Sequence, residues 1–163
     1  MKNKIIFYSD LIKLSEQIKK KGKVVILATG VFDLFHAGHK QFLQKAKDLG
    51  GILFVGVESD LRVKKLKGEK RPLDKLTERM NNVASFTSVD YVFSLPDNFG
   101  SEKEILALLR NLQPDYLSVS SHTKHQKQKR ELMKKIQGEL KVVMKQDKNI
   151  STSKLIKSLK KTS

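Results

Sequence analysis

The stretch that decides the fold runs from Val24 to Lys45 and reads VVILATGVFDLFHAGHKQFLQK. An apolar run of strand length, Val24–Ala28, stops at Thr29-Gly30. The turn that follows ends in His36–His39, where an amphipathic helical pattern begins. The sequence therefore predicts a strand, a tight turn and a helix, with two histidines at the start of the helix.

This strand–turn–helix unit predicts a phosphate site. The free N–H groups of a helix's first turn and the helix dipole attract anions. A glycine such as Gly38 lets the backbone approach a ligand closely. The imidazoles of His36 and His39 can donate hydrogen bonds to a phosphoryl group as charge develops on it.

The bulk composition predicts one ordinary domain. The chain has 163 residues, and no apolar run in it is long enough to span a bilayer. The first residues lack the apolar segment of a secretory signal. There is no cysteine, which excludes disulfides, thiolate metal sites and cysteine catalysis. We therefore expect a cytoplasmic protein in a reducing compartment, with no membrane partner.

The net charge of +16 is large, but its distribution argues against a nucleic-acid partner. Basic residues are spread along the chain, and only five of them are arginines, the residues that lead in base and bidentate phosphate contacts. Aromatic residues sit in apolar runs, away from the basic ones. A small anionic substrate, steered into a cleft, explains the charge better. RNA binding is kept as an alternative, and it predicts strongly salt-sensitive affinity for any RNA.

Short apolar runs alternate with helical periodicity along the chain, which is typical of a parallel sheet covered by helices. We expect strands over about 23–28, 52–57, 91–95, 116–119 and 140–144. We expect helices over about 9–20, 37–49, 76–85 and 124–137, and two more that begin at Ser101 and at residue 150. Ser9 and Ser101 are the expected caps of two of these helices. Residues 58–75 are polar and broken by glycine and proline, which indicates a loop. The fold class is thus α/β: a single, Rossmann-like, doubly wound domain with five parallel strands.

In such sheets the ligand lies at the carboxyl ends of the strands, where the strand order reverses. Four polar segments are expected at that edge: the histidine turn, Glu58–Asp60, Ser120–His122 and Ile150–Ser153. These segments follow different strands. The fold therefore predicts that they meet in one site, which no single segment would indicate.

Four blocks of the chain resemble the cytidylyltransferase-like nucleotidyltransferases that carry an HxGH signature. They are GVFDLFHAGH at 30–39, LKGEKRPL at 66–73, LTERM at 76–80 and ISTSKLI at 150–156. Ile156 stands where coenzyme A and NAD precursor adenylyltransferases carry an arginine, and sugar- and polyol-phosphate enzymes have an apolar residue there. The KGxxRP block looks most like heptose-1-phosphate adenylyltransferases, and the general layout also fits glycerol-3-phosphate cytidylyltransferase.

The resemblance implies a reaction. A phosphate oxygen of an acceptor attacks the α-phosphorus of a nucleoside triphosphate in line, and pyrophosphate leaves. Mg²⁺ is expected with the triphosphate. Transfer of AMP from ATP to a sugar or polyol phosphate is preferred over transfer of CMP, because Gln146 stands where cytidylyltransferases tend to carry an arginine. The alternatives are a CTP-dependent enzyme of the glycerol-3-phosphate type and a non-catalytic nucleotide-binding module. A homodimer is compatible with the resemblance.

The resemblance also implies an organisation and a set of site residues. Residues 1–22 are expected to form an N-terminal helical extension, and 23–163 the nucleotidyltransferase domain. The expected catalytic residues are His36, His39, Lys64 and Arg79. The expected nucleotide-binding residues are Thr29, Gly30, Val31, Phe32, Asp33, Gly38, Lys67, Arg71, Ser120, Ile150, Ser151 and Thr152.

Three of these expectations leave alternatives open. Asp33 either orients the turn through hydrogen bonds or helps to place magnesium, and Phe32 is expected to pack more than to bind. The loop at Ser120–His122 stands where the family frequently has a GGD or GDD sequence. The identity of the acceptor substrate is therefore left open. No protein metal ligands are expected, since His122 and His125 have no acidic or thiol partner nearby in the sequence.

Overall fold

The computed structural model describes residues 3–145 and 151–162, and its centre is one parallel sheet. The strands are β1 (Val25–Gly30), β2 (Ile52–Val57), β3 (Tyr91–Ser94), β4 (Tyr116–Ser120) and β5 (Glu139–Met144), in the order β3-β2-β1-β4-β5. The order reverses between β1 and β4, so the carboxyl ends of these two strands form the switch point. The predicted five-stranded, doubly wound sheet is confirmed.

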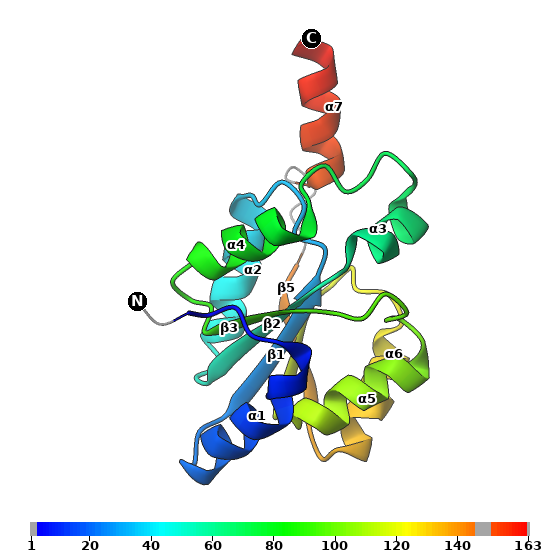
Figure 1. Ribbon diagram of the computed structural model, residues 1–163. Helices are drawn as coiled ribbons and strands as arrows, with labels where there is room; N and C mark the ends of the chain where they lie inside the picture. The colour runs from blue at the N-terminus through cyan, green and yellow to red at the C-terminus, as the bar shows by residue number, and fades with distance from the viewer. Residues whose placement is uncertain (1–2, 146–150, 163) are drawn as a thin grey trace.

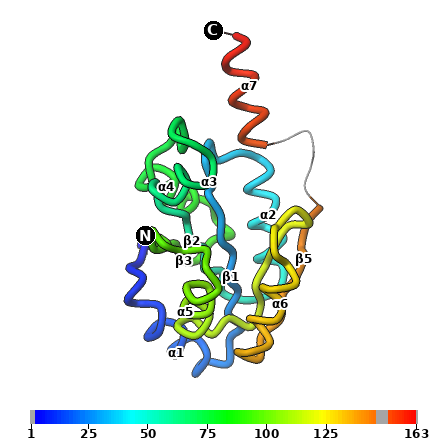
Figure 2. Tube along the Cα trace, turned by 90° about the vertical axis from the view of Figure 1, so that its right-hand side faces the viewer, coloured from blue at the N-terminus to red at the C-terminus, as the bar shows by residue number. Residues whose placement is uncertain are grey.

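Helices cover both faces of the sheet (Figure 1). One face carries α1 (Leu11–Lys20), α5 (Glu102–Leu112) and α6 (Gln126–Lys135), and the other carries α2 (Ala37–Lys47) and α4 (Leu76–Ser85). Two more, α3 (Asp60–Lys67) and α7 (Thr152–Thr162), lie beyond the carboxyl edge, and α7 extends away from the body of the domain (Figures 1 and 2). No helix in the described residues is both long enough and apolar enough to cross a membrane.

The apolar run of β1 is buried on both faces, as expected for a central parallel strand. Val25 and Leu27 pack in the core beneath α1, α5 and α6. Ile26 and Ala28 pack in the core beneath α2 and α4. Because successive side chains of a strand point to opposite faces, one short run supplies both cores.

The N-terminal segment packs onto the sheet. Leu11 and Ile18 of α1 are buried in the core that α1 shares with α5. Ahead of α1, the N–H of Ile6 donates to the carbonyl of Val92 at 2.9 Å, which extends the sheet beside β3. The predicted cap at Ser9 is wrong, because a 3₁₀ turn at Tyr8–Asp10 precedes α1 and the N-cap Asp10 makes no side-chain capping bond.

Residues 58–75, predicted as a loop, contain the helix α3. The hydroxyl of Ser59 accepts a hydrogen bond from the N–H of Arg62 at 3.2 Å and caps the helix. Gly68, with a φ of 99°, ends it. Val63 is the one buried residue of α3, so the sequence shows no apolar stripe there. The capping residue Ser59 is the signal that would have predicted the helix.

Candidate active site

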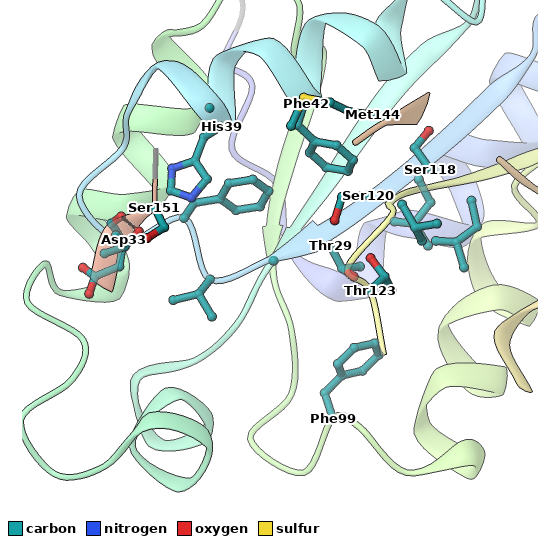
Figure 3. Close-up of a pocket in the computed structure, with 18 of the residues that line it drawn as sticks. Thr29, Asp33, His39, Phe42, Phe99, Ser118, Ser120, Thr123, Met144 and Ser151 are labelled. Carbon is teal, nitrogen blue, oxygen red and sulfur yellow. Dashed lines mark hydrogen bonds between the residues drawn. The ribbon is translucent and has the colours of Figure 1, made fainter. Parts of the chain in front are cut away.

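A cavity of about 390 Å³ opens at the switch point between β1 and β4 (Figure 3). Segments that are far apart in the sequence meet there: the turn after β1, the start of α2, the loop after β4, parts of α5 and α6, and the start of α7. The predicted site residues that line it are Thr29, Gly30, Val31, Phe32, Asp33, His36, Gly38, His39, Lys67, Arg71, Ser120, Ser151 and Thr152. Ile150 lies outside the described residues.

The turn after β1 has an unusual backbone. Phe32 and Leu34 have φ values of 55° and 48°, in the left-handed region that costs a non-glycine residue about 1 kcal/mol or more. Phe32 is only 3% exposed, and its ring lies so close to Gly30 that a Cβ there would be 3.0 Å from it. Packing of Phe32 on Gly30 therefore holds the turn in the shape that leads into α2.

Hydrogen bonds orient both histidine rings at the start of α2. The Nδ1 of His36 accepts from the N–H of Gly38 at 3.1 Å, and the Nδ1 of His39 accepts from the N–H of His36 at 3.3 Å. A neutral imidazole whose Nδ1 accepts carries its proton on Nε2. We therefore assign an Nε2–H donor to each ring.

Burial keeps both histidines neutral. It lowers the pKa of His36 below its usual value. Burial, followed by the neighbouring His36 and Lys67, lowers the pKa of His39 to about 3. Near pH 7 the two rings are therefore hydrogen-bond donors without a positive charge.

Aromatic packing holds the ring of His39 in place. It stacks on the ring of His36 with centroids 3.7 Å apart. Phe32 meets it edge-on at 5.4 Å, and Phe35 stacks on it at 5.8 Å. His39 therefore has little rotamer freedom, which is the preorganisation that a charge-stabilising group needs.

The start of α7 lies beside the histidines. The hydroxyl of Thr152 donates to the carbonyl of Asp33 at 2.9 Å, so it accepts from the Nε2–H of His36, 3.3 Å away. Ser151 caps α7, since its hydroxyl accepts from the N–H of Lys154 at 3.1 Å. The positive end of this 11-residue helix is thus directed at the same cavity as the start of α2.

Asp33 and Arg71 join the turn after β1 to the segment after α3. The carboxylate of Asp33 accepts from the Nε of Arg71 at 3.0 Å and from the N–H groups of Leu73 and Asp74 at 2.9 Å each. Burial alone would raise the pKa of Asp33, but these hydrogen bonds lower it below its usual value. The Nη2 of Arg71 is buried and has no partner among the described residues, and Arg71 is one of the residues that line the cavity.

Arg79, predicted on the phosphates, lies behind the site instead. Its side chain is fully buried, and it donates to the chain's own oxygens: the carbonyls of Asp74 and Val31, the carbonyl of Glu58, and the carboxylate of Asp60. These four acceptors engage its Nε, Nη1 and Nη2 atoms, so the guanidinium is held on all three nitrogens. The position of Arg79 corrects the prediction, because this guanidinium ties together the backbone that supports the site.

Lys64 is also placed differently from the prediction. It is exposed on α3 and does not line the cavity, whereas Lys67, near the end of the same helix, does. Burial, followed by the neighbouring Arg71, lowers the pKa of Lys67. Of the two lysines predicted here, Lys67 is the one in position to meet a phosphate.

Several lining residues were not predicted, and most have no clear sequence signal. They are Phe42, Phe99, Ser118, Thr123, Lys129 and Met144, with the apolar side chains of Leu27, Ile105, Leu108, Leu109, Leu117 and Val119. Phe42 is one helical turn after Gly38, so its place on the same face of α2 was predictable. Lys129 sits in a run of basic residues that nothing in the sequence distinguishes from one another.

A family model described as Cytidylyltransferase-like matches residues 27–158, a range that contains the histidine turn, the cavity and the start of α7. The chain belongs to this cytidylyltransferase-like family. The match begins at Leu27 within β1 and covers the rest of the parallel sheet through β5. The family resemblance of the four sequence blocks is thereby confirmed.

Curated relatives are bacterial proteins named bifunctional protein HldE. The one from a Nitratiruptor species is 38% identical over 110 residues, which are 68% of this chain and 23% of the relative. The one from Helicobacter pylori is 42% identical over 107 residues, 66% of this chain and 22% of the relative. The one from Yersinia pestis is 34% identical over 145 residues, 88% of this chain and 29% of the relative. The chain thus spans less than a third of the length of these relatives.

Two solved structures share the fold of this cytidylyltransferase-like protein. A lipopolysaccharide core biosynthesis protein from Thermoplasma volcanium superposes with a TM-score of 0.61 at 24% identity, over 77% of this chain and 98% of that one. Pantoate-beta-alanine ligase from Francisella tularensis, in complex with an ATP form and beta-alanine, superposes with a TM-score of 0.63 at 18% identity, over 96% of this chain and 77% of that one. At these identities the likeness concerns the fold.

Proposed function

We propose that this protein is a nucleotidyltransferase that moves AMP from ATP onto the phosphate of a sugar or polyol phosphate and releases pyrophosphate. The observation that carries the proposal is one wall of the cavity. There, the neutral His39 presents its Nε2–H donor, His36 stacks on it with its own Nε2–H on the hydroxyl of Thr152, and the cations Lys67 and Arg71 line the same cavity. These donors suit the oxygens of a polyphosphate.

Each donor has a place in the reaction. An oxygen of the acceptor phosphate forms a bond to the α-phosphorus while the bond from the α-phosphorus to the bridging oxygen breaks, and pyrophosphate leaves with that electron pair. His39 donates its Nε2–H to an α-phosphoryl oxygen, where charge develops in the transition state, and His36, bound to Thr152, holds the ring of His39 in place. Lys67 and Arg71 hold the β- and γ-phosphates and so stabilise the leaving pyrophosphate. An ionised acceptor phosphate needs no general base.

The described residues do not offer Mg²⁺ a site of their own. Asp33 is the one carboxylate among them that lines the cavity, and both of its oxygens already accept hydrogen bonds from Arg71, Leu73 and Asp74. Residues 3–145 and 151–162 also hold no group of three or more candidate ligands. An accompanying Mg²⁺ would therefore be held by the phosphates and water, as this ion commonly is.

The KGxxRP block is the reason for proposing ATP as the nucleotide substrate, and CTP with glycerol 3-phosphate is the alternative. The two are distinguished by measuring pyrophosphate release with each triphosphate in the presence of glucose 1-phosphate, mannose 1-phosphate or glycerol 3-phosphate as the acceptor. A higher kcat/KM with ATP and a sugar phosphate supports the proposal, whereas a higher kcat/KM with CTP supports the alternative. Binding of a triphosphate without pyrophosphate release, for any of these acceptors, would indicate a nucleotide-binding module.

A further inference from the structure

Among the described residues that line the cavity, Lys129 is a third cation besides Lys67 and Arg71. Lys129, in the second turn of α6, lines the cavity together with Ser120 and Thr123 from the end of β4 and its following loop. Lys129 is on α6 and the histidines are at the start of α2, and these two helices cover opposite faces of the sheet (Figure 1).

No carboxylate neutralises Lys129 directly. Among the described residues, no carboxylate oxygen lies within 4.0 Å of its Nζ, whereas Lys134 and Lys135 on the same helix pair with Glu131 and Glu102. Lys129 is partly buried, and that burial lowers the pKa of its ammonium. A desolvated cation without a close partner favours an anionic ligand.

Glu58 is the acidic group near Lys129, and it is shared among several cations. Its carboxylate interacts at a distance with Arg62, Lys129 and Arg79, in that order of strength. Burial raises the pKa of Glu58, and its Oε2 accepts no hydrogen bond in the described part of the chain. Lys129 therefore shares Glu58 with two arginines and has no carboxylate of its own in the described part of the chain.

The proposed reaction needs a cation in this place. The triphosphate is held on the histidine wall, and the acceptor phosphate must approach it against charge repulsion. We propose that Lys129, with the hydroxyls of Ser120 and Thr123, binds the phosphate of the acceptor, a phosphate monoester. This inference rests on the proposed function and assigns the two anionic substrates to different residues of one cavity.

Sequential titration tests the assignment. The protein is first saturated with magnesium and α,β-methylene-ATP, or its cytidine counterpart if CTP is preferred, because the methylene bridge prevents release of pyrophosphate. Inorganic phosphate and glucose 1-phosphate are then titrated into that complex by calorimetry. We expect Lys129→Gln to weaken phosphate binding about 10- to 100-fold, as for a lost charged hydrogen bond, and to leave the Kd of the nucleotide analogue unchanged.

Matched variants control for charge and folding. Lys127→Gln removes one charge from an exposed position of the same helix and should leave both affinities unchanged. Lys129→Arg keeps the charge and should retain part of the phosphate affinity. Thermal unfolding confirms that each variant is folded.

Three results would overturn the inference. They are wild-type affinity for both phosphate probes in Lys129→Gln, an equal loss of phosphate and analogue affinity in that variant, and a wild-type analogue complex that binds neither probe. Failure of the wild type to bind the nucleotide analogue at all is a different result, seen in the first titration, and it would overturn the proposed function itself.

Discussion

The Nδ1 of His39 accepts the backbone N–H of His36 at 3.3 Å, so the backbone of the first histidine holds the ring of the second. This bond leaves the Nε2–H of His39 as the donor available to the cavity. The ring is neutral, because burial, followed by the neighbouring His36 and Lys67, lowers its pKa to about 3. The site therefore offers phosphoryl oxygens an oriented donor whose charge does not change near neutral pH.

Replacing His39 should abolish most of the activity without unfolding the protein. In His39→Ala the α-phosphoryl oxygens lose a preorganised donor, and we expect kcat for pyrophosphate release to fall about 100- to 1,000-fold. His122→Ala is the matched control, since His122 is exposed and does not line the cavity. Equal activity of His39→Ala and His122→Ala would show that the histidine wall is not catalytic.

The low pKa of His39 predicts a pH dependence of stability. Below pH 6.5 the unfolded chain protonates this histidine, while the folded protein keeps it neutral down to a pKa of about 3. The unfolded state thus binds more protons in this window, and the free energy of unfolding falls as the pH falls from 6.5 toward 3.

Urea unfolding at pH 7.0, 6.0 and 5.0 measures this dependence. The variant His39→Asn cannot titrate, so its loss of stability over this range should be smaller than that of the wild type. Parallel losses in both proteins would mean that His39 is not held neutral.

The two arginines of the site should respond differently to substitution. Arg79 is fully buried and bound to four oxygens of the chain, so Arg79→Lys should lower the free energy of unfolding by about 3–5 kcal/mol. The nucleotide Kd of its folded fraction should stay near the wild-type value. Arg71→Gln removes a cation that lines the cavity and should raise that Kd about 10-fold or more. The reverse pattern would place Arg79, and not Arg71, on the phosphates.

Thr152 couples the start of α7 to the catalytic turn. In Thr152→Val the carbonyl of Asp33 and the Nε2–H of His36 both lose their partner, and we expect kcat to fall about 10-fold. Thr152→Ser keeps the hydroxyl and should retain most of the activity. Steady-state pyrophosphate release compares the two, and full activity of Thr152→Val would show that this contact does not support catalysis.

The sequence predicts the fold well where its patterns have a simple physical cause. Apolar runs such as Ile52–Val57 and the stripe of Leu76–Ser85 are recovered at the predicted bounds. Parallel strands bring their carboxyl ends to one edge, so the convergence of the histidine turn, Ser120 and Ser151 also follows from the pattern. These predictions need no knowledge of individual side-chain contacts.

Other features depend on tertiary contacts that leave no local pattern. The helix α3 buries only Val63, so its sequence indicates a loop. Arg79 stands in a block that indicates phosphate binding, yet its partners come from three separate segments that only the fold brings to it. Lys129 reaches the cavity because α6 packs against β5 and α5, and nothing near it in the sequence marks it.

The most direct test of the central claim is to follow which phosphorus of the nucleotide is transferred. The protein is incubated with magnesium, an acceptor phosphate and ATP or CTP labelled with ³²P at either the α- or the γ-position, and the products are separated. The nucleotidyltransferase account predicts that the α-label appears in a new product with the acceptor, that the γ-label appears in pyrophosphate, and that His39→Ala abolishes both. Transfer of the γ-label to the acceptor, or an α-label that stays in the nucleotide for every acceptor tried, would contradict it.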